Sequence, residues 1–139
     1  MSFSSHNAMR AYTETNASNA MAQDPHGLVA MLFEGAMLAV AAARTNTQLG
    51  QVQKKCEAIS KAIAIIEDGL YASLDEEAGG EISQQLGQLY EYMVSRLVEA
   101  NANNQTQPLE EVGSLLSQLA SAWASIKPGA NVEASVENA

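Results

Sequence analysis

The sequence holds few of the side chains from which catalytic and metal sites are built. Among its 139 residues there are 1 cysteine, Cys56, and 2 histidines. A single cysteine cannot form an intramolecular disulfide or a Cys-x-x-Cys metal site, and such usage favours a reducing compartment. Because Cys56 falls on an apolar helical stripe, we interpret it as a filler of the core.

Basic residues are also scarce: 7 Lys and Arg stand against 16 Asp and Glu, and the formal net charge is -9. Nucleic acids and anionic membranes bind mainly to clusters of Lys and Arg, so we expect neither nucleic-acid binding nor membrane insertion. The apolar run LVAMLFEGAMLAVAAAR contains Glu34 and is shorter than the roughly 20 residues that span a bilayer. It is better explained as a helix that protein covers on several sides.

The first 23 residues lack the apolar stretch of a secretory signal, so the sequence predicts a cytoplasmic location. No arrangement typical of an enzyme is visible either. A di-metal carboxylate site in a helical bundle needs Glu-x-x-His pairs, no nucleophile has an evident base, and no phosphate-binding loop occurs. We therefore expect binding rather than catalysis, and no cofactor. One alternative stays open: His26 could accept a phosphoryl group in a phosphorelay bundle, although no Lys or Arg lies near it in sequence.

What the sequence does contain is four long helical patterns joined by short connections. The first begins at Asp24 and Pro25, where an N-cap acceptor precedes a proline whose missing N–H is not needed, and it ends near Gln48. The second follows Gly50 and ends near Asp75.

The third and fourth patterns are separated by NANNQTQP, which disfavours helix continuation. The third follows the glycine pair 79–80, one of which can take a positive φ, and the fourth ends before Pro128. Short connections force neighbouring helices to run in opposite directions. The sequence thus predicts an all-α fold, an antiparallel up-down four-helix bundle over residues 24–127, with a mobile arm over 1–23 and a disordered acidic tail over 128–139.

Each of the last three helices has one face that is apolar in steps of three and four residues, which is typical of a core seam. In the second helix the seam consists of Val52, Cys56, Ile59, Ile63, Ile66 and Leu70. In the third helix it consists of Ile82, Leu86, Leu89, Met93, Leu97 and Ala100. In the fourth it consists of Leu109, Val112, Leu116, Leu119, Trp123 and Ile126.

Two helices carry a further apolar row, rotated from the seam at about 100° per residue. These rows could broaden the core contact, form a groove for an amphipathic segment of a partner, or let the bundle associate with itself through small residues. Tyr92 lies on neither row. The rows are Ala58, Ala62, Ile65, Gly69 and Ala72 in the second helix, and Tyr90, Val94, Val98 and Asn101 in the third.

Several segments match, in order, the motifs of one known family. The longest is GGEISQQLGQLYEYMVSRLVEAN, and DPHGLVAMLFEGAM, AYTETN and EEVGSLLSQLASAW accompany it. With these blocks the chain resembles the FliS family of flagellar export chaperones over roughly residues 9–127. Departures from the family pattern occur at His26, Gly27, Phe33 and Ser95.

The resemblance implies a chaperone that binds the disordered C-terminal segment of flagellin, prevents premature polymerisation and delivers it to the flagellar type III export apparatus. Under this hypothesis the two additional rows form the client groove. Met9 and Tyr12 are expected to form a detachable latch over that groove or a contact for the export gate. A phosphorelay through His26 and a self-associating structural bundle remain the alternatives, and a homodimer stays open.

Overall fold

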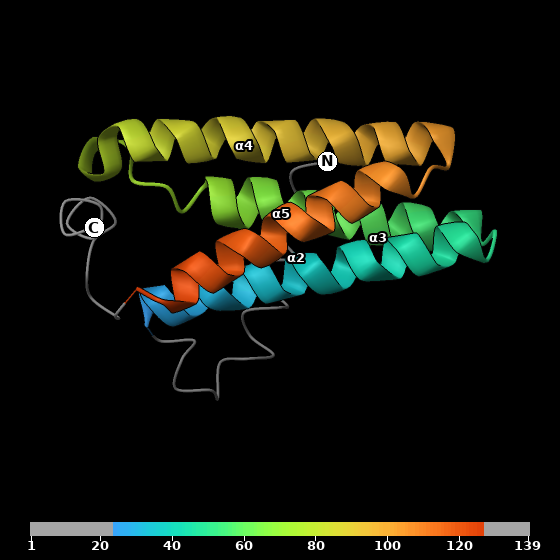
Figure 1. Cartoon of the computed structure of the whole chain (residues 1–139), viewed down its shortest axis with the longest axis horizontal. Helices are drawn as coiled ribbons and strands as arrows, with labels where there is room; N and C mark the ends of the chain where they lie inside the picture. The colour runs from blue at the N-terminus through green and yellow to red at the C-terminus, as the bar shows by residue number, and fades with distance from the viewer. Residues whose placement is uncertain (1–23, 127–139) are drawn as a thin grey trace.

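The computed structural model describes residues 24–126, and all regular structure in that range is helical (Figure 1). Because the π-helical segment η2 continues α3 without a break, the chain forms four helical rods, as predicted. The expected arm over 1–23 and tail over 128–139 concern residues outside the described range. The elements are α2 (Pro25–Gln48), α3 (Val52–Ala64), η2 (Ile65–Tyr71), α4 (Glu76–Asn103) and α5 (Gln107–Ala124).

The four rods form a closed antiparallel bundle. Helix α2 contacts α3, the α3–η2 rod contacts α4, α4 contacts α5, and α5 returns to α2. The colours in Figure 1 show that successive rods run in opposite directions and that α5 crosses α2 obliquely. The connections over 49–51, 72–75 and 104–106 are too short for any other order. The predicted fold class is therefore confirmed.

Local signals place two of the helix ends. Asp24 caps α2, since its side chain accepts a hydrogen bond of 3.2 Å from the backbone N–H of His26, and Pro25 occupies the first turn. At the opposite end of the bundle, Asn104 follows α4 in the left-handed conformation with φ 53°. Both boundaries lie where the sequence predicts them.

The start of α4 depends on its glycine pair. Gly80 has φ 55° and ψ -127°, a conformation open essentially only to glycine, and the helix kinks there. A Cβ on Gly79 would lie 1.8 Å from the hydroxyl oxygen of Ser83. That hydroxyl donates a 2.9 Å hydrogen bond to the carbonyl of Asp75 and so ties the turn to α4. The expected positive φ within the pair is confirmed at Gly80.

The core runs along the bundle axis and contains most of the seam residues. Val52 is an exception: it is 56% exposed, because it is the first residue of α3 and adjoins the exposed turn 49–51. Cys56 is only half-buried, at the margin of the core rather than within it. The fully buried seam residues are Ile59, Ile66, Leu70, Met93, Leu97, Ala100, Leu109, Val112 and Leu116.

Helix α2 is long and apolar enough to cross a membrane by length and composition alone. Half of its most apolar window is buried inside the bundle, where it packs against α3, η2 and α5. Three neighbouring elements therefore account for its apolar circumference. One residue of its outer face, Leu38, remains 65% exposed.

The π-helix η2 is not predicted by the sequence pattern, which indicates one continuous α-helix. Its seven residues, Ile65–Tyr71, wind with a wider turn, and Ile65, Ile66, Gly69 and Leu70 all become buried. A wider turn lets adjacent positions face the interior together. Segments of this kind are uncommon and occur frequently at functional sites.

Candidate functional site

The additional row of α4 passes from the interior to the surface along the helix. Tyr90 is 3% exposed, Val94 and Asn101 are half-buried, and Val98 is 54% exposed. Burial raises the pKa of the Tyr90 hydroxyl to about 12, in keeping with its position in the core. The accessible apolar members of the row are therefore Val94 and Val98.

The additional row of the α3–η2 rod is mostly interior. Ala62 is 0% exposed, Ile65 is 2% exposed and Gly69 is buried, whereas Ala58 is half-buried and Ala72 is exposed. Of the alternatives that the sequence leaves open, a broader core contact therefore holds for the three buried residues of this row. The α3–η2 rod packs against both α2 and α4, so it needs two apolar faces rather than one.

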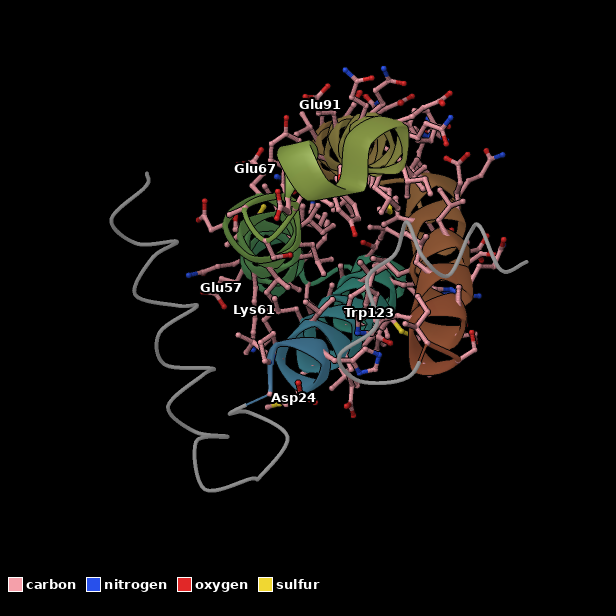
Figure 2. All side chains as sticks on the ribbon, turned by 90° about the vertical axis from the view of Figure 1, so that its left-hand side faces the viewer. Asp24, Glu57, Lys61, Glu67, Glu91 and Trp123 are labelled. Atoms are coloured by element: carbon pink, nitrogen blue, oxygen red, sulfur yellow. The ribbon has the colours of Figure 1, made fainter. Side chains whose placement is uncertain are left out.

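Between η2 and α4 a hollow of about 140 Å³ adjoins the accessible end of these rows. The buried side chains of Ile66 and Tyr90 form a mainly apolar base. Two exposed carboxylates, Glu67 from η2 and Glu91 from α4, stand on the same side of the molecule (Figure 2). The full lining is Ile66, Glu67, Tyr71, Tyr90, Glu91 and Val94.

A larger cavity of about 400 Å³ lies at the end of the bundle where α2 and α4 begin and α5 ends. Figure 2 looks onto this end and labels Trp123, which is one of the lining residues. Several of the lining residues belong to the predicted core seams, and their apolar spacing does not predict a cavity. Its apolar lining consists of Val29, Phe33, Leu74, Ile82, Leu86, Tyr90, Leu119, Ala122, Trp123 and Ile126.

His26 and Trp123 hold the two helix ends at this cavity together. The Trp123 indole N–H donates a 2.8 Å hydrogen bond to the carbonyl of His26, and His26 Nε2 lies 3.0 Å from the carbonyl of Trp123. The two rings stack with centroids 4.8 Å apart. Because a carbonyl only accepts, Nε2 must be the donor, and it is engaged in joining α2 to α5 rather than presented to a phosphodonor.

The family model described as "Flagellar protein FliS" matches residues 6–130. The chain belongs to the FliS family. It is 47% identical over 128 residues to the flagellar secretion chaperone FliS of Salmonella typhimurium, a match that covers 91% of this chain and 95% of the relative. The Escherichia coli flagellar secretion chaperone FliS is 43% identical over 115 residues, covering 82% of this chain and 85% of the relative.

A third relative, the flagellar secretion chaperone FliSB of Pseudomonas aeruginosa, is 41% identical over 117 residues, which cover 84% of this chain and 92% of the relative. The resemblance to the FliS family that the motifs indicate is therefore confirmed. It extends across the whole described bundle, so the four rods are the fold of a FliS family member.

Within the FliS signature, Tyr92 has a role that the sequence does not reveal. Its hydroxyl donates a 2.7 Å hydrogen bond to Glu111 Oε2, while Arg96 Nε donates a 2.6 Å bond to Glu111 Oε1. Hydrogen bonds from Tyr92 and Arg96 hold the pKa of the Glu111 carboxyl below its ordinary value, and the bond to Glu111 raises the pKa of Tyr92. Tyr92 thus connects α4 to α5.

Asn101, the last residue of the signature, is a structural link between α4 and α3. Its carbonyl accepts a 2.8 Å hydrogen bond from the ammonium of Lys55, which is only 2% exposed, and its side-chain oxygen accepts a 3.2 Å bond from the Cys56 thiol. The same ammonium donates to the side chain of Asn104. The sequence does not predict this contact. Lys55 lies in a region with ordinary helical spacing, and nothing in that spacing distinguishes it from an exposed lysine.

Among the side chains that the structure describes, which exclude those of residues 76–78, no three His, Cys, Asp or Glu come together in a way that could hold a metal ion. Met9 and Tyr12 lie outside the described residues. What the described site offers is therefore a binding surface: a hollow between η2 and α4, the accessible ends of two apolar rows, and an apolar cavity at the end of the bundle.

Proposed function

We propose that this chain is a cytoplasmic secretion chaperone of the bacterial flagellum that binds the C-terminal segment of flagellin for export. It has no enzymatic activity. The observation that carries the proposal is its membership of the FliS family, with 47% identity to the Salmonella chaperone over nearly the whole of both chains. A match of this extent includes the helices, the connections and the surfaces between them.

The physical design fits a protein that holds its client unfolded. A disordered segment that folds on binding loses conformational entropy at that moment, so it can cover a large apolar area and still be released. The bundle offers separate apolar sites along its length rather than one deep pocket. A long segment could therefore contact it through several short amphipathic stretches.

We place client docking on the face where the α3–η2 rod meets α4. The accessible members of the two rows, Ala58, Ala72, Val94 and Val98, would contact the client directly. The buried members, Ala62, Ile65, Gly69 and Tyr90, would support that surface from beneath, and Asn101 would hold the α3–α4 contact in place. This division of roles follows from the exposure of each residue.

The test is binding of a synthetic peptide with the C-terminal sequence of flagellin from the same bacterium. We expect Val98→Asp to weaken binding by about tenfold or more, because it places a charge in an apolar contact. Leu38→Asp is the matched control, since Leu38 is 65% exposed against 54% for Val98 and lies on the outer face of α2. Equal affinity of both variants for the peptide would remove Val98 from the docking surface.

For the N-terminal arm we propose that Met9 and Tyr12 cover the client surface when it is empty or contact the export gate. Deletion of residues 1–15 should then change either the affinity for the flagellin peptide or the motility of the bacterium. A deletion that changes neither would exclude both roles.

The alternative functions make separate demands on the bundle. Phosphorelay needs an accessible histidine, whereas His26 stacks on Trp123 and its Nε2 bonds to the Trp123 carbonyl. Labelling of His26 by a phosphodonor kinase would overturn this interpretation. Self-association through the small-residue row needs Ala62 and Gly69 to be exposed, and both are buried. Light scattering with and without flagellin would measure any homodimer and show whether the client dissociates it.

A further inference from the structure

The hollow between η2 and α4 combines an apolar base with negative charge at its rim. Glu67 and Glu91 both line it, and both are exposed. No Lys or Arg is among the lining residues. Lys61 stands on the same side of the molecule, but it belongs to α3 and does not line the hollow (Figure 2).

The two carboxylates are poorly paired. Among the described residues, the Glu67 carboxylate makes no hydrogen bond or ion pair, and the Glu91 carboxylate accepts one long bond of 3.4 Å from the Tyr71 hydroxyl. Two like charges at one site repel each other, and a cation placed between them would remove that repulsion. Glu67 is followed by Asp68, which adds to the negative potential on this side.

The lining of the hollow favours a long cationic side chain over a free metal ion. Its base of Ile66 and Tyr90 is apolar and would cover the methylene stem of an Arg or Lys, whose charged end would then reach the carboxylates at the rim. The ring of Tyr71, 37% exposed, offers a face against which a guanidinium can stack. Two carboxylates alone are a weak metal site, because they leave most ligand positions empty.

The backbone provides a second, independent observation. Three of the six lining residues, Ile66, Glu67 and Tyr71, belong to the π-helix η2. A π-helix is less stable than the α-helix that the sequence pattern would otherwise continue, and such segments occur frequently at functional sites. The wider turn brings Ile66 into the base of the hollow and keeps Glu67 and Tyr71 at its rim.

We infer that this hollow binds an Arg or Lys side chain of the client, in a segment where that basic residue neighbours an apolar one, and that Glu67 and Glu91 thereby help to select and position the client. The inference rests on the proposed function and adds a charge requirement to it. It predicts that binding depends on salt, because exposed charge pairs weaken as ionic strength rises.

The test compares the full-length chain with two double variants of identical net charge. Glu67→Gln with Glu91→Gln removes both carboxylates from the hollow, and Glu34→Gln with Glu81→Gln removes two exposed carboxylates elsewhere. The ligand is the synthetic C-terminal flagellin peptide, titrated by fluorescence anisotropy at low and high salt. We expect the hollow variant to bind about tenfold more weakly at low salt and to lose most of the salt dependence, while the control resembles the native chain.

A second series identifies the partner residue. Each Arg and Lys of the peptide is replaced in turn by Gln. One replacement should weaken binding to the native chain and have no further effect on the hollow variant, because the two substitutions remove the same contact.

The remaining outcomes separate the two proposals. If the native chain binds the peptide and the hollow variant binds it equally well, the charge requirement is wrong and the chaperone function stands. If the hollow variant binds more tightly, the two carboxylates oppose client binding and the charge requirement is likewise wrong. If the native chain does not bind the peptide at all, the proposed function itself fails.

Discussion

Asn104 combines two stabilising features that different substitutions can separate. It ends α4 with φ 53°, and its side-chain oxygen accepts a hydrogen bond from the buried ammonium of Lys55. A hydrogen bond to a charged donor contributes about 1.5–3 kcal/mol, and the left-handed conformation costs a residue such as alanine roughly 1 kcal/mol. Asn104→Ala loses the bond and keeps the unfavourable conformation, whereas Asn104→Gly loses only the bond.

We therefore expect Asn104→Ala to lower the free energy of unfolding by about 2.5–4 kcal/mol and Asn104→Gly by about 1.5–3 kcal/mol. For a domain of this size the alanine variant should melt about 10 °C below the native protein. Urea unfolding followed by circular dichroism measures both free energies, and a scan of temperature checks their order.

The contribution of the ammonium is isolated by Lys55→Met, which keeps an apolar stem of similar length. Combined with Asn104→Gly, it forms a double-mutant cycle in which we expect a coupling of about 1 kcal/mol or more. Two results would refute the reasoning. Equal stabilities of the alanine and glycine variants would show that the backbone conformation contributes nothing, and additive effects of the two substitutions would show that Lys55 and Asn104 do not interact.

Two further predictions test the interior of the bundle. Ile65→Asp places an unpaired carboxylate at a position that is 2% exposed, which costs several kcal/mol out of a total stability of about 5–15 kcal/mol. Helical circular dichroism should therefore be lost at 25 °C. A variant that still folds would contradict the place of Ile65 in the core. The pKa of Tyr90 is about 12 when folded and near 10 when unfolded, so stability is full below pH 10 and falls by roughly 2–3 kcal/mol as pH rises through 12, because the unfolded chain loses the proton first. Tyr90→Phe should flatten this part of the unfolding profile, and an unchanged slope would show that another group causes it.

Helix boundaries could be predicted because the signals for them are local. Asp24 with Pro25 and the run NANNQTQP specify a start and a stop through capping and the absence of an N–H, and α2 begins and α4 ends there. The glycine pair 79–80 instead marks a kink inside α4, which begins at Glu76, and the α3–η2 rod ends at Tyr71 rather than near Asp75. The seams were predictable for a related reason. A helix fixes the direction of every side chain, so apolar spacing alone shows which face turns inward.

The same spacing could not decide how far inward a second row lies. Ile65 and Val98 both belong to apolar rows beside a seam, yet one is 2% and the other 54% exposed. The difference arises because the α3–η2 rod has a neighbour on both sides, and only the arrangement of all four rods determines that. The π-helical turn of η2 depends on the same packing and has no local signal in the sequence.

The motifs alone were sufficient for the family and its function, since the match to FliS proteins covers most of the chain. The candidate site could be predicted only in part. Tyr90 and Val94 belong to an apolar row that the sequence indicates, but in the sequence Glu67 and Glu91 look like ordinary surface acids, and no pattern distinguishes them.

By itself the sequence determined the four helices, their antiparallel order and the family, because each depends on the order of residues along one helix or one connection. Only the tertiary structure decided which apolar residues remain accessible, and it alone joined Lys55 to Asn101 and His26 to Trp123. These pairs lie 46 and 97 residues apart. Contacts at such separation arise from how complete helices pack, and no short stretch of sequence contains both partners.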